Sequence, residues 1–177
     1  DAIDNYKKAL KIKPDYAEAY YNMGITLKKK GDLEGAIVSY KHALEIKSDY
    51  AEAYYNMANA LKDKGNFEAA IISYKNALEI KSDYAEAYYN MGIALKKKGN
   101  LKAAIDSYIN ALKIKPENVK AYINMGNIQK DKGDLEAAID SYKNVLKIKP
   151  DNAEAYYNIG DVLRDKGDLE AAIDSYK

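Results

Sequence analysis

A repeat of 34 residues runs through this 177-residue chain and constrains its fold more than any other feature. The stretch AEAYYNMGI at residues 17–25 returns four more times with few changes, and its asparagine keeps its place in every copy. These asparagines are Asn22, Asn56, Asn90, Asn124 and Asn158. A constant period of this length indicates stacked supersecondary units rather than one closed globule.

Each repeat, numbered from Ala17 as position 1, is predicted to contain two helices joined by tight turns. Apolar residues at helical spacing span positions 1–14, and the glycine at position 15 is typical of a left-handed helix C-cap. Asp or Asn at position 16 predicts the N-cap of a second helix, which ends near position 31. The tyrosines at positions 4 and 24, such as Tyr20 and Tyr40, are expected in the core.

The motif DYAE precedes three of the first helices, at residues 15–18, 49–52 and 83–86. Its two acidic residues have the spacing of a capping box, in which the side chain of the first residue caps the helix. The motif therefore predicts that Asp15, Asp49 and Asp83 are the N-caps of these helices.

Charge and composition argue against several classes of partner. Lys and Arg number 28 against 27 Asp and Glu, a balance that predicts no nucleic-acid partner. The lysine runs at 28–30 and 96–98 lie in the last turn of a helix, where cations complement the helix dipole. No run approaches the roughly 18 apolar residues of a membrane span, so we expect no membrane partner and a cytoplasmic location.

The sequence predicts no catalytic chemistry. The chain has no cysteine, and its one histidine, His42, stands where other repeats carry asparagine, as expected of a surface variant. The carboxylates alternate with lysines and show no metal-ligand spacing, and every glycine fits a role in the repeat. We therefore expect no catalytic residue, no metal and no cofactor, and we expect that the chain is not an enzyme.

The residues of the repeat resemble the tetratricopeptide repeat (TPR) family, whose pattern is W-x2-L-G-x2-Y, then A-x3-F, then P. Residue size and spacing agree with that pattern, although several large residues are substituted. The matching residues of the first full repeat are Tyr20, Met23, Gly24, Leu27, Ala36, Tyr40 and Ser48. The resemblance implies an all-α, right-handed superhelical solenoid of tandem 34-residue helix-turn-helix repeats.

The resemblance also implies a single TPR array over residues 1–177. It begins with a partial repeat at 1–16 that holds a second helix only, and it ends with a partial repeat at 153–177. The full repeats are 17–50, 51–84, 85–118 and 119–152. Because the chain begins and stops inside second helices, it looks like an excerpt. We predict that both ends expose apolar surface and associate end to end with neighbouring molecules.

In the resembled family, one face of the first helix lines an inner groove that binds extended peptides or short helices. The resemblance therefore predicts a peptide-binding groove from the five asparagines at position 6 and from residues at positions 5, 9 and 12. Those at position 5 are Tyr21, Tyr55, Tyr89 and Tyr157, and those at position 9 are Ile25, Asn59, Ile93 and Asn127. Those at position 12 are Lys28, Lys62, Lys96 and Lys130.

Two interpretations of the asparagines stay open. A carboxamide can bond both the N–H and the C=O of an extended peptide, so a row of them would bind a peptide backbone. This arrangement resembles the TPR region of O-linked N-acetylglucosamine transferases. Alternatively, each amide bonds a neighbouring first helix and holds the superhelix together. The carboxylate clamp of chaperone-binding TPR domains is not expected, because position 5 carries no lysine.

A longer pattern alternates between neighbouring repeats. Positions 9 and 13 are Ile25 and Lys29 in the first full repeat and Asn59 and Asp63 in the next one. The following two repeats show the same alternation. With first helices two repeats apart and about 3.3 Å per extended residue, it predicts ligands whose apolar residues lie about six apart and that are more acidic near the repeats with lysine. Duplication of a two-repeat block is the alternative explanation.

Together these features favour a scaffold for protein–protein interaction that binds an extended peptide or helix of a partner. The alternatives are a substrate-targeting arm of a larger enzyme, such as a glycosyltransferase, and a self-assembly module. The partner's identity is not encoded in the repeat pattern.

Overall fold

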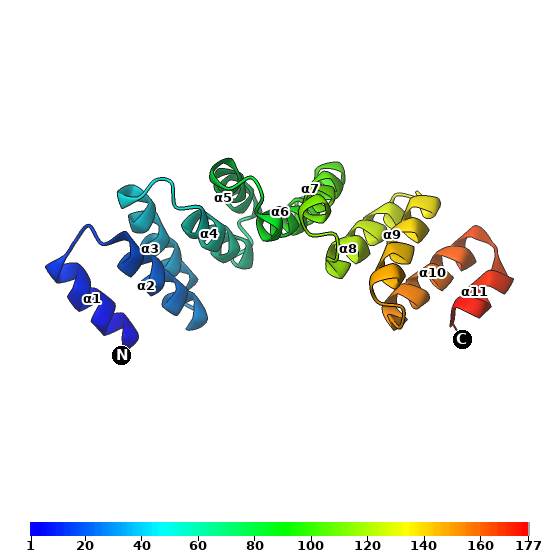
Figure 1. The fold of residues 1–177 in the computed structure, drawn as a ribbon, viewed down its shortest axis with the longest axis horizontal. Coiled ribbons are helices and arrows are strands. Elements are labelled where there is room, and N and C mark those ends of the chain that lie inside the picture. Colours follow the sequence, from blue (N-terminus) through cyan, green and yellow to red (C-terminus); the bar gives the residue numbers. More distant parts are fainter. Residues whose placement is uncertain (177) are drawn as a thin grey trace. The chain divides into compact units, whose positions relative to one another are not determined.

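The computed structural model describes residues 1–176, and this part of the chain is all α-helical (Figure 1). Its helices are α1 (Ala2–Ile12), α2 (Ala17–Lys29), α3 (Leu33–Ile46), α4 (Ala51–Asp63), α5 (Phe67–Ile80), α6 (Ala85–Lys97), α7 (Leu101–Ile114), α8 (Val119–Asp131), α9 (Leu135–Ile148), α10 (Ala153–Lys166) and α11 (Leu169–Tyr176). The helices alternate between the first and second helices predicted for each repeat, which we name A and B helices. The A helices are α2, α4, α6, α8 and α10.

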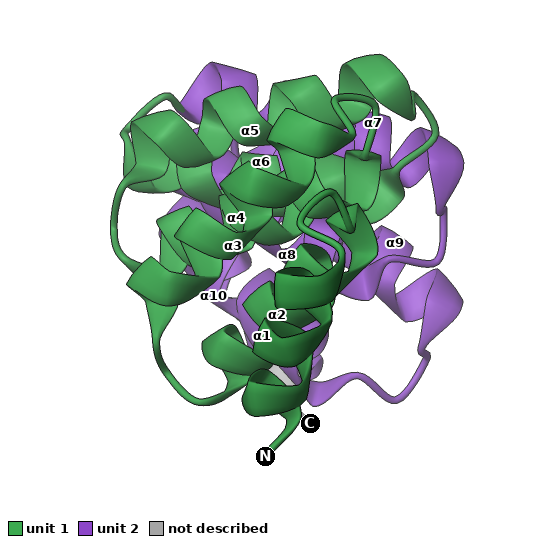
Figure 2. Ribbon diagram, turned by 90° about the vertical axis from the view of Figure 1, so that its left-hand side faces the viewer, with its two compact units in different colours: residues 1–100 green, residues 101–177 purple. Residues whose placement is uncertain are grey.

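The chain divides into two compact units, residues 1–100 and residues 101–177, coloured green and purple in Figure 2. In unit 1, α2 packs on α3 and α4 packs on α5, and each B helix also packs on the A helix that follows it. In unit 2, α8 packs on α9 and α10 on α11, and α7 and α9 pack on the following A helices. The prediction of one continuous array over both units stays a prediction.

The predicted turn between the A and B helices is confirmed. The glycines at position 15 all have φ between 80° and 86°, the left-handed conformation that favours glycine at a C-cap. The residue that follows them caps the B helix: Asp32 Oδ1 accepts a hydrogen bond from the Gly35 N–H at 2.8 Å, and Asn66 caps α5 in the same way. These short-range signals determine where each B helix begins.

The capping boxes predicted from DYAE are wrong. The N-caps of α2, α4 and α6 are Tyr16, Tyr50 and Tyr84, and none of them makes a side-chain cap bond. The aspartate of the motif therefore lies one residue too early to cap the helix. Before α8 and α10, asparagine stands in place of the tyrosine. Asn118 and Asn152 cap these helices, and each accepts a hydrogen bond from the backbone N–H three residues later.

Packing of the tyrosine rings explains the missing caps. The Tyr50 ring lies 4.8 Å from the Tyr21 ring, and the Tyr84 ring lies 4.7 Å from the Tyr55 ring, measured between centroids. Aromatic pairs in this range contribute about 0.5–1.5 kcal/mol beyond their buried area, comparable to the ~1 kcal/mol of a helix cap. Before α4 and α6, Tyr50 and Tyr84 therefore pack on the preceding A helix where a shorter polar residue would cap the helix.

The core between A and B helices is built on the tyrosine at position 24, as predicted. Tyr40, Tyr74, Tyr108 and Tyr142 are fully buried. A Cβ atom at Gly24 would lie 2.6 Å from the Tyr40 ring, so glycine leaves the space that this ring fills.

The tyrosines at position 4 differ from the prediction, because they lie at the edge of the core. Tyr20 is half-buried against the His42 ring at 5.1 Å, and Tyr156 is 43% exposed.

Candidate functional site

In unit 1 the predicted groove residues lie on three consecutive A helices, since α2 contacts α4 and α4 contacts α6. We name this set the A surface of unit 1. All of its side chains are partly buried except Asn22, which is exposed. Its residues are Tyr21, Asn22, Ile25 and Lys28 of α2, Tyr55, Asn56, Asn59 and Lys62 of α4, and Tyr89, Asn90, Ile93 and Lys96 of α6.

In unit 2 the predicted residues lie on α8 and α10. Asn124, Asn127 and Lys130 of α8 and Asn158 of α10 are partly buried, whereas Tyr157 of α10 is 59% exposed. The preceding A helix offers Asn158 no hydroxyl at position 5, where Ile123 stands in place of the tyrosine. Each unit therefore carries its own part of the predicted site.

Asparagine and tyrosine form pairs between adjacent A helices of unit 1. Asn56 Nδ2 donates to the Tyr21 hydroxyl at 2.9 Å, and Asn90 Nδ2 donates to the Tyr55 hydroxyl at 3.1 Å. The asparagine at position 6 thus bonds the tyrosine at position 5 of the preceding repeat. These contacts match the interpretation in which the amide bonds a neighbouring first helix, with a side-chain hydroxyl as its partner.

The three asparagines of unit 1 differ in how much hydrogen-bonding capacity is left. The amide of Asn22 has no partner within residues 1–176, and Asn56 keeps its Oδ1 and one N–H unused there. Asn90 has no N–H left to donate, because its second N–H donates to the Glu86 carbonyl at 3.0 Å, and its Oδ1 already accepts from Lys62 Nζ at 3.0 Å. A peptide backbone would therefore find unused amide N–H groups on α2 and α4 but not on α6.

Two of the tyrosines at position 5, Tyr21 and Tyr55, lie in aromatic clusters. The Tyr21 ring lies 6.0 Å from Tyr40 and 4.8 Å from Tyr50, and Lys47 Nζ lies 4.7 Å from the Tyr50 ring centroid. Burial raises the pKa of Tyr21, and burial raises the pKa of Tyr50 to about 12, so both hydroxyls are neutral donors and acceptors near neutral pH. Sequence reasoning missed the tyrosines at position 34, although their recurrence inside DYAE was visible.

The residue at position 9 determines whether the hydroxyl of the core tyrosine in the same repeat has a hydrogen-bond partner. The Tyr74 hydroxyl donates to Asn59 Oδ1 at 2.7 Å, and the Tyr142 hydroxyl donates to Asn127 Oδ1 at the same distance. Where position 9 is Ile25, the Tyr40 hydroxyl is buried without a hydrogen-bond partner. The alternation therefore has a role inside the chain, and the predicted six-residue spacing of ligands stays a prediction.

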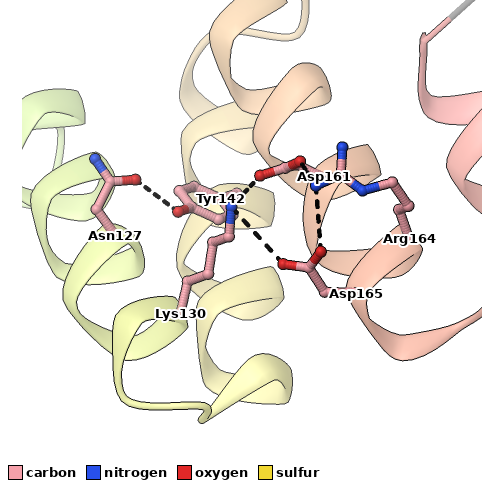
Figure 3. A network of polar contacts seen from close by, with 6 residues as sticks. All are labelled: Asn127, Lys130, Tyr142, Asp161, Arg164 and Asp165. Carbon is pink, nitrogen blue, oxygen red and sulfur yellow. Dashed lines mark hydrogen bonds and ion pairs between the residues drawn. The ribbon is translucent and has the colours of Figure 1, made fainter.

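Three of the lysines at position 12, Lys28, Lys62 and Lys130, bond to side chains of the following A helix. Lys28 Nζ lies 2.9 Å from Asp63 Oδ2 in unit 1. In unit 2, Lys130 pairs with Asp161 and lies 3.9 Å from Asp165, and Arg164 pairs with both aspartates (Figure 3). Asp161 is only 13% exposed, and the hydrogen bond from Lys130 holds its pKa below the ordinary value.

Other parts of the described chain offer no competing chemistry. Residues 1–176 contain no group of three or more His, Cys, Asp or Glu that could hold a metal ion, and no helix long and apolar enough to cross a membrane. His42 is exposed and lies 2.9 Å from Glu45. A pocket in unit 1 is lined by α5 and the end of α6, including Ile72 and Lys75, and contains none of the predicted groove residues.

Comparisons with solved structures show the same fold of paired helices. The solved structure of MamA is 30% identical, with a TM-score of 0.83, and the match covers 87% of this chain and 90% of that chain. YrrB, described as a TPR protein with an unusual peptide-binding site, is 26% identical over 96% of this chain and 88% of that chain, with a TM-score of 0.82. PilF of Pseudomonas aeruginosa shares the fold at 22% identity, with a TM-score of 0.75 over 90% of this chain and 73% of that chain.

The comparison with curated proteins found no match. The matches above carry nothing specific to the glycosyltransferases that the asparagine pattern resembles. The family described as TPR repeat matches residues 1–31, 26–65, 58–99, 94–133 and 126–163, and the family described as tetratricopeptide repeat matches 153–177. The predicted all-α fold of tandem repeats is confirmed, and the chain belongs to the tetratricopeptide repeat family.

Proposed function

We propose that this chain is a protein-interaction module that binds an extended segment of a partner protein on its A surface. The observation that carries the proposal is the unused hydrogen-bonding capacity of Asn22 and Asn56, two neighbouring amides on adjacent A helices. The similarity to YrrB, a TPR protein described as having a peptide-binding site, supports it.

The chemistry of binding follows from the groups that remain open. Asn56 Oδ1 would accept from a peptide N–H, and its unused Nδ2 hydrogen would donate to a peptide C=O, so the segment is held by its backbone. The half-buried Tyr21 and Tyr55 present apolar ring surface beside these amides. Backbone bonding gives affinity for an extended chain, and the rings give preference for apolar side chains.

The proposal assigns the chain no catalytic residue, metal or cofactor. A substrate-targeting arm of a larger enzyme would use the same surface in the same way, so the two functions share one binding mode. A cytoplasmic location and end-to-end association stay predictions beside this proposal.

The test is a panel of random 12-residue peptides, selected against the chain and titrated by calorimetry against point variants. Asn56→Ala is expected to weaken binding by about fivefold or more, because it removes two net hydrogen bonds worth about 0.5–1.5 kcal/mol each. Asn76→Ala on α5 makes the same chemical change away from the A surface and is the matched control. The proposal fails if Asn56→Ala and Asn76→Ala bind the selected peptides equally well.

A further inference from the structure

The two junctions between A helices in unit 1 differ in their ion pairs. Between α2 and α4, Lys28 pairs with Asp63 at 2.9 Å. Between α4 and α6, the residue equivalent to Asp63 is Lys97, which cannot pair with Lys62. Lys62 Nζ donates instead to Asn90 Oδ1 at 3.0 Å, so its hydrogen-bond partner is a neutral amide.

Positive charge accumulates at this second junction. Lys96 is half-buried and Lys97 is exposed, and neither has an ion-pair partner within unit 1, residues 1–100. The acidic residue at this end of α4, Asp63, is already bound by Lys28. Glu86 lies in the first turn of α6, ten residues from Lys96 and thus roughly 15 Å away along the helix axis. The near-zero net charge of the whole chain conceals this local excess.

The lowered pKa of Lys62 is consistent with the lack of a carboxylate partner on α6. Burial lowers the pKa of Lys62, and repulsion from Lys28 adds to this, against the attraction of Asp63. A half-buried ammonium group gains most from a carboxylate, because partial burial weakens the screening by water.

Unit 2 shows what a complete junction looks like. There the equivalent lysine, Lys130, is bound by Asp161 and lies near Asp165, both on the following A helix (Figure 3). The hydrogen bond that Lys130 donates to Asp161 raises the pKa of Lys130, the opposite of the shift at Lys62. The carboxylate that unit 2 carries in its own sequence is absent between α4 and α6.

We propose that the bound segment supplies this carboxylate, so that the A surface of unit 1 selects an acidic extended segment whose Asp or Glu pairs with Lys62 and Lys96. This inference rests on the proposed function and names the chemistry of its partner. Asn22 and Asn56 hold the backbone of the segment, and the lysines at the ends of α4 and α6 select its side chains. The site differs from a clamp for a terminal carboxylate, because its lysines stand at positions 12 and 13 rather than 5 and 2.

The experiment uses three fluorescent peptides of equal length that alternate glycine with glutamate, glutamine or lysine, titrated by anisotropy against the full chain. We expect the glutamate peptide to bind roughly tenfold more tightly than the glutamine peptide, with the lysine peptide weakest. Lys62→Gln is expected to remove most of that preference. Lys41→Gln on α3 makes the same charge change at an exposed B-helix position and is expected to keep it.

The outcomes separate this inference from the proposed function. Equal binding of the glutamate and glutamine peptides, or an unchanged preference in Lys62→Gln, would overturn the acidic selection while peptide binding stands. Failure of all three peptides to bind would overturn the proposed function together with the inference. In the supporting outcome, an NMR titration of the Lys62 side chain also shows its pKa rising when the glutamate peptide binds.

Discussion

At the scale of single residues, neighbouring repeats place the same tyrosine in two different environments. Tyr74 donates its buried hydroxyl to Asn59, whereas the buried hydroxyl of Tyr40 has no hydrogen-bond partner. An unpartnered buried hydroxyl destabilises the fold, while a partnered one stabilises it modestly. The repeat thus contains a built-in comparison of the two cases.

Two phenylalanine variants measure this difference. Tyr74→Phe is expected to lower the free energy of unfolding by about 0.5–1.5 kcal/mol, because it removes a hydrogen bond and leaves Asn59 Oδ1 without its donor. Tyr40→Phe is expected to leave stability unchanged or to raise it, since the hydroxyl it removes has no partner. Urea unfolding of both variants provides the measurement, and equal losses would contradict the assignment.

Asp161 makes stability depend on pH in unit 2. The hydrogen bond from Lys130 is the main cause of its lowered pKa, and the charges of Lys130 and Arg164 lower it further. A carboxyl group whose pKa is depressed by folding stabilises the protein above its unfolded pKa, here near 3.8. That stability is lost as the pH falls through the folded-state pKa.

Asp161→Asn is therefore expected to cost about 1.5–3 kcal/mol of unfolding free energy near neutral pH, the range for hydrogen bonds to charged groups. The difference from wild type should shrink as the pH falls below the unfolded pKa of 3.8, and it should be lost only below the lower folded-state pKa, where the folded wild-type carboxyl is protonated and no longer charged. Chemical unfolding at both pH values tests this, and a difference that does not depend on pH would show that the charge is not involved.

At the scale of helices, an exposed ion pair joins successive repeats. The lysine at position 14 pairs with the residue at position 18 of the preceding repeat, as in Lys98 with Glu68 and Lys166 with Glu136, both at 2.7 Å. In each pair the hydrogen bond from the lysine lowers the pKa of the glutamate. Between α7 and α8 this pair is replaced by two lysines, Lys102 and Lys132.

Lys102→Glu is expected to complete the pair with Lys132 and to stabilise the α7–α8 junction by about 0.2–1 kcal/mol, typical of exposed pairs. A double-mutant cycle with Lys132→Ala separates the pair from the gain of an acidic residue near the helix N-terminus. The coupling should disappear near 1 M salt, where the Debye length is about 3 Å. Coupling near zero at low salt would rule out the pair.

How much the sequence could predict depended on the range of the interaction. The 34-residue period, the left-handed Gly31 and the cap at Asp32 were predictable, because each depends on residues close together in the chain. The caps expected at Asp15, Asp49 and Asp83 were wrong, and at α4 and α6 aromatic packing of Tyr50 and Tyr84 with the preceding A helix accompanies the loss of the local cap. Local patterns do not contain that tertiary contact.

At the scale of the whole molecule, near-identical repeats do not make identical surfaces. Asn22, Asn56 and Asn90 are indistinguishable in the sequence pattern, yet the structure leaves both N–H groups of Asn22 unused, uses one of Asn56 and uses both of Asn90. The difference arises from which side chains the neighbouring helices bring within reach, and a period cannot show this. The sequence predicted the row of asparagines, and the helix packing decides which of them can bind.

The most direct test of the central claim is an NMR titration of the isotope-labelled full chain with a peptide selected from the random library. If the A surface of unit 1 binds an extended segment, the side-chain amide signals of Asn22 and Asn56 shift upon binding. Those of Asn76 and Asn144, on the B helices α5 and α9, stay in place. Shifts confined to the B-helix asparagines, with Asn22 and Asn56 unchanged at saturation, would contradict the account.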